Sequence, residues 1–111
     1  MILDTSSVIR RVKRDEEIGE NVTSITLIEY PPIGGYRKFR GRVYFVTVED
    51  QMLAAELQRR LRRAGRPLSA ADLLIAAVCL NRGEELLTED EDFLAVVEIE
   101  PSLKVVVESP G

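Results

Sequence analysis

Several acidic residues stand at points of the chain where a strand is predicted to end or a helix to begin. They are Asp4, Glu29, Asp72, Asp90 and Asp92, in a chain of 111 residues that contains no histidine. Carboxylates held a few ångströms apart repel each other or force protonation, so such a group requires a cation. Hard oxygen ligands favour Mg²⁺ or Mn²⁺. If the fold gathers these residues, we therefore expect metal-assisted phosphate chemistry.

Other catalytic resources are scarce in this sequence. The lack of histidine excludes a histidine general acid–base pair and a zinc site with histidine ligands. There is no Gly-x-x-x-x-Gly-Lys segment of the kind that cradles phosphates. The single cysteine, Cys79, lies in the apolar run 74–80 and is interpreted as a core residue. The carboxylates are the strongest chemical signal.

The composition is typical of one globular domain, which we expect to span residues 1–111. Hydrophobic residues make up 45% of the chain and charged residues 31%. No stretch approaches the roughly 20 apolar residues of a membrane span, and no signal peptide is visible, so we expect a cytoplasmic protein without membrane contact. Residues 1–71 carry a net charge of +4 and residues 72–111 one of −8. This split is compatible with a basic face beside an acidic pocket.

The first half of the chain predicts short strands followed by helices. The apolar pair at 2–3 predicts a buried strand, and a helix should run from the turn at 4–7 to about Arg14. A second short strand is expected at 22–25 and a helix at 26–30. Pro31 and Pro32 must disturb that helix, because proline restricts the residue before it. The β-branched and aromatic segment 43–46 predicts the clearest strand.

The second half shows sharper helix boundaries. Thr47 with Asp50 three residues later predicts a helix start, and residues 65–67 should end that helix. Ser69 should cap a helix over 70–81, closed by Gly83. A strand at 85–88, a short helix at 92–96 and a strand at 104–107 complete the chain. This alternation predicts an α/β fold, with a small central parallel sheet between helical layers, and ligands at the carboxyl ends of the strands.

Four segments resemble, in order, the acidic motifs of the PIN-domain family, most closely its VapC-type toxin ribonucleases. They are Asp4-Thr5-Ser6, Thr26-Leu27-Ile28-Glu29, Ser69-Ala70-Ala71-Asp72 and Thr88-Glu89-Asp90-Glu91-Asp92-Phe93. The resemblance extends from residue 1 to about residue 107. It implies a PIN-like three-layer α/β/α fold. It also implies a ribonuclease that uses Mg²⁺ or Mn²⁺, normally a homodimer inhibited by a small antitoxin protein.

The resemblance also implies roles for individual residues. Asp4, Glu29, Asp72 and Asp90 would be catalytic, and Asp4, Asp72, Asp90 and Asp92 would hold metal. The hydroxyls of Thr5, Ser6 and Thr88 would orient these ligands. Simpler interpretations exist: Asp4 is well placed to cap a helix, and Ser69 with Asp72 forms a capping box.

Two points stay open in the sequence. The first is whether Asp90 or Asp92 is the fourth ligand. The second is whether Glu29 faces the site, because Pro31 and Pro32 depart from the family pattern. For RNA phosphates the candidates are Arg10, Arg37, Lys38 and Arg40, although most such arginines simply form solvated faces or ion pairs.

The leading hypothesis is a metal-dependent ribonuclease that cleaves RNA phosphodiester bonds and is the toxin of a toxin–antitoxin pair. One alternative is a catalytically weak PIN-like module that acts through dimerisation or protein contacts. Another is a phosphatase or phosphotransfer receiver with Asp4 as nucleophile. It is disfavoured because Ser6 stands where a second aspartate is needed and no lysine follows Thr88 near the strand end.

Overall fold

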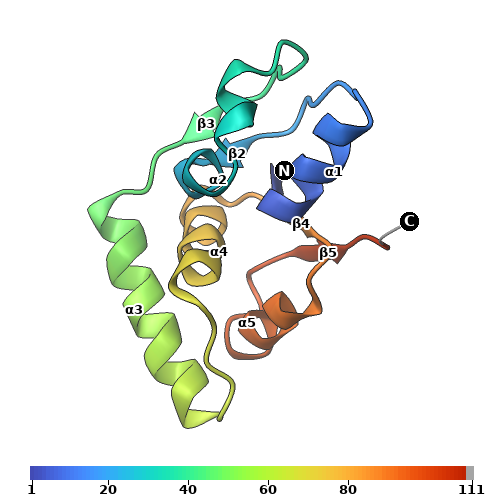
Figure 1. Cartoon of the computed structure of the whole chain (residues 1–111). Helices are drawn as coiled ribbons and strands as arrows, with labels where there is room; N and C mark the ends of the chain where they lie inside the picture. Colours follow the sequence, from blue (N-terminus) through green and yellow to red (C-terminus); the bar gives the residue numbers. More distant parts are fainter. Residues whose placement is uncertain (110–111) are drawn as a thin grey trace.

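The computed structural model describes residues 1–109 of the chain, and in this range short strands alternate with helices (Figure 1). The strands are β1 (Ile2–Leu3), β2 (Val22–Thr23), β3 (Val43–Tyr44), β4 (Leu86–Thr88) and β5 (Val105–Val107). The α-helices are α1 (Thr5–Lys13), α2 (Ser24–Glu29), α3 (Val48–Arg63), α4 (Ala70–Arg82) and α5 (Leu94–Ile99). Two short 3₁₀ helices are η1 (Pro31–Gly35) and η2 (Glu91–Phe93).

All the paired strands run parallel, which confirms the predicted class of fold. One sheet has the strand order β1-β4-β5, and β2 pairs with β3 in a second piece. An isolated bridge between Ile2 and Asn21 connects the two pieces, and the Leu3 amide donates to the Asn21 carbonyl at 2.9 Å. The carboxyl ends of β1 and β4 therefore lie side by side.

The two faces of the sheet bury two different apolar clusters. Ile2 and Leu86 face a cluster that includes residues of α3, α4 and α5. Leu3 and Leu87 face a second cluster with Val8 of α1 and residues near η1. Because both faces are covered, neighbouring residues of one strand are both buried, as parallel sheets require. Figure 1 shows α1 on one side of β4 and β5 and α3 and α4 on the other.

The third helix packs inward as its leucine spacing predicts. Leu57 and Leu61 are completely buried, and Leu53 packs against the same cluster. No helix within residues 1–109 is both long and apolar enough to cross a membrane.

The boundaries of α3 and α4 confirm the predictions from capping residues. The Thr47 hydroxyl accepts a hydrogen bond from the Asp50 amide, and the Asp50 carboxylate accepts one from the Thr47 amide. The Ser69 hydroxyl accepts from the Asp72 amide at 3.2 Å. Gly83 ends α4 with φ of 64°, the left-handed conformation that favours glycine.

Other boundaries differ from the sequence-based expectation. The strand expected at 43–46 ends at Tyr44, because the Val46 amide donates to the Ser24 hydroxyl instead of to a strand, and Phe45 is exposed. Strand β2 is also shorter than predicted, since the chain turns into α2 at Ser24. The helix expected at 92–96 is a 3₁₀ turn followed by α5, which continues to Ile99.

Candidate active site

A cavity of about 600 Å³ opens beside the carboxyl ends of β1 and β4. We call it the carboxylate cavity. It is lined by Asp4, Thr5, Ser6, Ile9, Glu29, Asp72, Glu89 and Asp90. Acidic residues from four separate regions of the sequence thus meet at one place, as the parallel topology predicts.

Asp4 is the most buried acid of the cavity. It follows β1 and caps α1, accepting a hydrogen bond from the Thr5 amide at 2.8 Å. Its other oxygen accepts from the Thr88 hydroxyl at 2.8 Å and, at 3.5 Å, from the Ser6 hydroxyl. Burial raises the pKa of Asp4, although the Thr88 and Thr5 hydrogen bonds oppose that shift. The side chain is therefore fixed in direction while its charge is poorly solvated.

Glu29 lies at the last residue of α2 and faces the cavity. The Thr5 hydroxyl donates to Glu29 Oε1 at 2.7 Å, and the same hydroxyl contacts the Thr26 hydroxyl at 2.9 Å. Tyr30, the residue before Pro31, is non-helical, as proline favours, so α2 ends at Glu29 and the prolines begin η1, where proline is well tolerated. The question that the sequence left open is thereby answered: Glu29 points toward the carboxylate cavity.

Asp72 lies in the first turn of α4 and is half-buried. Burial, followed by the nearby charge of Asp4, raises the pKa of Asp72 to about 6. The cap by Ser69 opposes this shift. Asp72 therefore occupies the capping position expected from Ser69 and also lines the cavity.

The acids after β4 separate into two groups. The Asp90 amide donates to the Thr88 hydroxyl at 2.9 Å, and Asp90 lines the carboxylate cavity. Asp92 is exposed and lines a different cavity with residues 65–68, so the expectation that it faces the same site is wrong. The cause is η2: the Asp92 amide donates to Asp90 Oδ1 at 2.8 Å, and this turn carries the Asp92 side chain away.

Glu89 also lines the cavity, although the sequence pattern does not predict it there. It shares the cavity with the other acids, and one of its oxygens lies 3.7 Å from Arg10 Nη1. Its only signal in the sequence is its place between Thr88 and Asp90, in an acidic run that usually indicates a solvated face.

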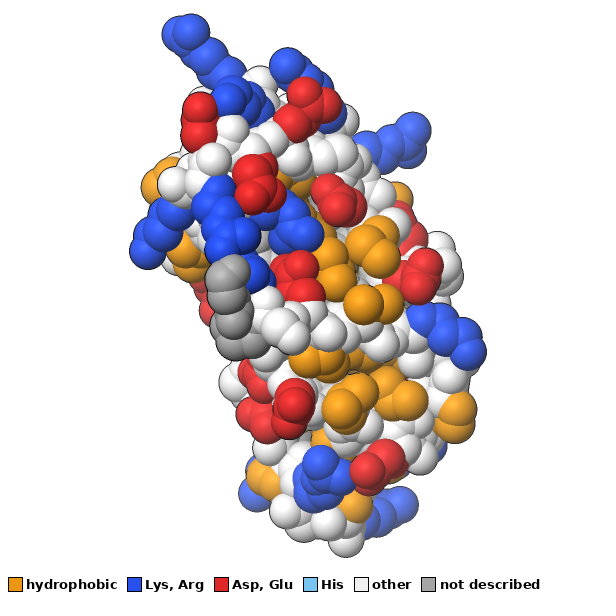
Figure 2. Space-filling model, turned by 90° about the vertical axis from the view of Figure 1, so that its right-hand side faces the viewer, with side chains coloured by type: hydrophobic (Ala, Val, Ile, Leu, Met, Phe, Trp, Pro, Cys, Tyr) orange, Lys and Arg blue, Asp and Glu red, His pale blue; other side chains and the backbone are white. Residues whose placement is uncertain are grey.

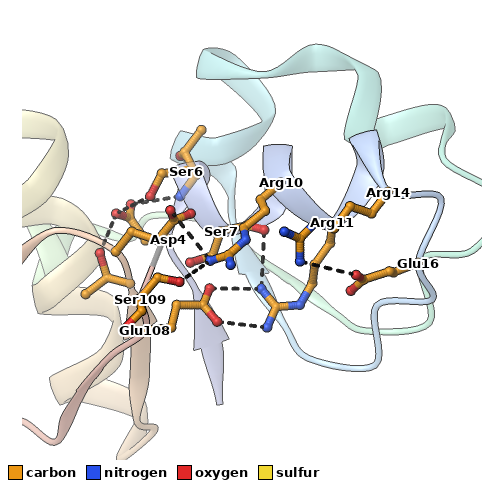
Figure 3. A network of polar contacts seen from close by, with 12 residues as sticks. Asp4, Ser6, Ser7, Arg10, Arg11, Arg14, Glu16, Glu108 and Ser109 are labelled. Atoms are coloured by element: carbon orange, nitrogen blue, oxygen red, sulfur yellow. Dashed lines mark hydrogen bonds and ion pairs between the residues drawn. The ribbon is translucent and has the colours of Figure 1, made fainter. Parts of the chain in front are cut away.

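The basic candidates for RNA phosphates do not lie together. Arg10 borders the cavity through Glu89, and Figure 3 shows it donating to the Ser109 carbonyl. The segment with Arg37, Lys38 and Arg40 pairs instead with Ile18, which precedes β2. That places the segment toward the amino ends of the strands, and Lys38 forms an ion pair with Asp15 at 2.7 Å. None of these three residues lines the carboxylate cavity.

The donor atoms of the cavity suit a hard divalent cation, since they are carboxylate and hydroxyl oxygens. The raised pKa values of Asp4 and Asp72 show that the charges there are poorly compensated by the protein alone. Within residues 1–109, however, no three acidic or cysteine side chains approach closely enough to form a metal site as they are oriented. The residues fit such an ion by chemistry and placement, and their side chains would have to converge on it.

Comparisons with known proteins give the family and the fold of the chain. The family model of the PIN domain matches residues 37–99, and no characterised protein matches the sequence significantly. A solved structure of VapBC2 from Rickettsia felis, bound to a promoter DNA fragment, aligns with a TM-score of 0.74 and 18% identity over 96% of both chains.

Two further solved structures are similar. VapBC from Salmonella typhimurium, bound to DNA, aligns with a TM-score of 0.74 and 21% identity over 96% of each chain. VapBC-5 from Mycobacterium tuberculosis, a toxin–antitoxin system, aligns with a TM-score of 0.72 and 23% identity over 96% of this chain and 97% of that one. At these identities the likeness concerns the fold, and the family is given by the sequence match over more than half of the chain. The protein belongs to the PIN-domain family.

Proposed function

We propose that this protein is a divalent-metal-dependent endoribonuclease and the toxin of a toxin–antitoxin pair. The observation that carries the proposal is the carboxylate cavity, where Asp4, Glu29, Asp72 and Asp90 meet at the carboxyl ends of parallel strands. Membership of the PIN-domain family supports it, because PIN domains generally use divalent metal ions.

Each proposed residue has a separate task at the cavity. Asp4, Asp72 and Asp90 would hold Mg²⁺ or Mn²⁺, with Asp4 oriented by the Thr88 and Thr5 hydrogen bonds. Glu29, held by the Thr5 hydroxyl, would accept a proton from an attacking water. When bound, such an ion stabilises charge on the phosphate and makes water a stronger nucleophile. The poor solvation of Asp4 and Asp72 favours cation binding over two free charges.

The toxin role and the partners rest on the similar structures. The VapBC structures hold a toxin with its antitoxin, and two of them are bound to DNA. By analogy we propose a small antitoxin protein as the partner of this chain, and a homodimer of the chain itself, in the cytoplasm.

A catalytically weak binding module is the second candidate. One observation favours it: the acids within residues 1–109 do not converge into a metal site in their present orientations. The orientation of Glu29 argues against the binding module. In a module that had lost catalysis we would expect Glu29 to be turned away, whereas it faces the cavity.

RNA cleavage by the purified protein tests the proposal. The reactions contain Mn²⁺ or EDTA, with wild type, Asp4→Asn and Glu91→Gln in parallel. Glu91 is an exposed acid outside the cavity, so its variant controls for the loss of one negative charge. We expect cleavage that needs the ion, disappears in Asp4→Asn and persists in Glu91→Gln. Absence of cleavage together with absence of Mn²⁺ binding in calorimetry would favour the binding module.

A further inference from the structure

A second cavity continues from the carboxylate cavity along helix α1. We call it the basic groove. It has a volume of about 480 Å³ and is lined by Ser6, Ile9, Arg10, Lys13, Arg14 and Glu89. Three of these residues, Ser6, Ile9 and Glu89, line both cavities. The two are therefore adjoining parts of one surface depression, one part acidic and the other basic.

Helix geometry places the three cations of the groove on one side of α1. Arg10, Lys13 and Arg14 follow at intervals of three and four residues, which share a helix face. Arg10 is nearest the acids, at 3.7 Å from Glu89, and Arg14 follows one helical turn later. The order of charges along the depression is thus carboxylates, then Arg10, then Lys13 and Arg14.

Arg11 has a different task from its neighbours. Its two terminal nitrogens lie 3.2 and 3.3 Å from the two oxygens of Glu108, just after β5. Figure 3 shows this paired contact, together with Arg10 reaching the Ser109 carbonyl. Arg11 therefore fastens the chain after β5 to α1. Lys13 and Arg14 are exposed at the rim of the groove, where Arg14 also forms an ion pair with Glu16 at 4.0 Å. From the side on which α1 lies, Lys and Arg side chains gather directly beside acidic ones (Figure 2).

We propose that the basic groove binds the phosphodiester backbone of an RNA strand whose reacting phosphate lies in the carboxylate cavity. This inference rests on the proposed function. A cavity lined by five acidic residues repels a polyanion, and the whole chain carries a net charge of −4. Cations within one or two helical turns of the acids offset this repulsion locally and fix the direction in which the strand leaves.

The groove also sets the minimum length of a good substrate. Arg10 and Arg14 are about 6 Å apart along the helix axis, so contacts to both require phosphates beyond the reacting one. A dinucleotide reaches only the carboxylate cavity, whereas a longer strand also fills the groove. Oligonucleotides of increasing length should therefore bind more tightly until the groove is occupied.

Binding without cleavage tests the groove directly. The double variant Lys13→Ala/Arg14→Ala is compared with Arg62→Ala/Arg63→Ala, which removes the same charge from the last turn of α3, far from α1 in Figure 1. Both are made in an Asp4→Asn background, and binding of a labelled single-stranded RNA is measured by anisotropy in EDTA. We expect the groove variant to bind about 10-fold more weakly and the control to change less than about twofold. In the groove variant the magnitude of the negative slope of log K against log salt should decrease by about 1.4, for the two lost phosphate contacts.

The outcomes separate the groove from the nuclease proposal. If wild type cleaves RNA but both double variants bind with equal affinity and equal salt slope, the groove inference is overturned and the proposed nuclease stands. If wild type does not cleave but only the groove variant loses binding, the groove stands and the nuclease fails. A single-stranded DNA of the same sequence should lose affinity in the same proportion. A loss confined to RNA would contradict a phosphate contact.

Discussion

At the scale of single residues, the acids after β4 offer the sharpest comparison. Asp90 and Asp92 have the same side chain two positions apart, but only Asp90 lines the carboxylate cavity. We expect Asp90→Asn to lower the rate of RNA cleavage about 100-fold or more, because it removes a proposed metal ligand. Asp92→Asn should change the rate less than about threefold. Cleavage kinetics of the two variants, with Mn²⁺ in excess, check this, and equal losses would reject the assignment of Asp90.

Thr88 connects two acids of the site through one hydroxyl. It donates to Asp4 and accepts from the Asp90 amide, and it is completely buried. Thr88→Val keeps the shape but removes both of these hydrogen bonds, so we expect Mn²⁺ affinity in calorimetry to fall about 10- to 100-fold. Thr88→Ser keeps the hydroxyl and should stay close to wild type. If the serine variant falls as far as the valine variant, packing of the methyl group is the cause instead.

The residue scale is also where prediction from sequence reached its limit. Asp4, Asp72 and Asp90 could be predicted to meet, because their places at strand and helix ends follow from local pattern. The direction of Asp92 could not, since it depends on a single 3₁₀ turn. Glu29 was ambiguous for a similar reason: only the contact with Thr5, 24 residues away, shows that it faces the cavity.

At the scale of elements, Asp50 joins two helices through buried charge. Asp50 belongs to the capping box of α3, and it also accepts hydrogen bonds from Asn81 and Arg82 at the end of α4, each at 2.8 Å. These hydrogen bonds, against the cost of burial, lower the pKa of Asp50 to about 2. The capping role was predicted from the sequence. The link to α4 was not, because it joins residues 32 positions apart.

The lowered pKa of Asp50 makes a prediction for stability against pH. The group's pKa is lower in the folded than in the unfolded chain, so the unfolded state binds more protons. The contribution of the Asp50 carboxylate to the free energy of unfolding is therefore complete above about pH 4 and is lost as the pH falls toward 2. A shift of this size corresponds to about 2 kcal/mol.

Urea denaturation of wild type and Asp50→Asn at several pH values measures this contribution. We expect Asp50→Asn to be less stable by about 2 to 4 kcal/mol at pH 7, because Arg82 loses its partner. The difference should shrink below about pH 3. Glu49→Gln, an exposed acid beside it in the same helix turn, is the matched control and should cost less than about 0.5 kcal/mol. A difference independent of pH would contradict the charged role of Asp50.

Among the elements, helices were predicted more accurately than strands. The limits of α3 and α4 follow from capping chemistry that is written in adjacent residues, such as Ser69 and Gly83. Strands β2 and β3 are only two residues long. The extent of each depends on its pairing with the other strand and on where the chain turns away. At Gly41 an added Cβ would lie 1.8 Å from the Glu20 carbonyl oxygen, so the segments before β2 and β3 pass very close to each other. Sequence pattern does not reveal such a long-range constraint.

At the scale of the whole molecule, the two apolar clusters meet at the central strands. In β1, Ile2 belongs to one cluster and Leu3 to the other, and β4 alternates in the same way. Neither cluster can lose its packing without exposing one face of the same strands. We therefore expect the chain to unfold as a single cooperative unit, which is the prediction of one domain over residues 1–111.

Core substitutions on opposite faces test this cooperativity. Leu61→Ala opens a cavity in the cluster of α3, α4 and α5, and Ile33→Ala opens one in the cluster beside η1. Each should cost about 2 to 5 kcal/mol of unfolding free energy. Circular dichroism reports the helices, whose buried apolar side chains belong mostly to the first cluster. Fluorescence of the tyrosines reports mainly the second, against which Tyr30 and Tyr36 pack. Because the two faces share β1 and β4, both probes should shift together in either variant, with one midpoint. Separate midpoints, with each variant moving only its own probe, would show that the two sides of the sheet unfold independently.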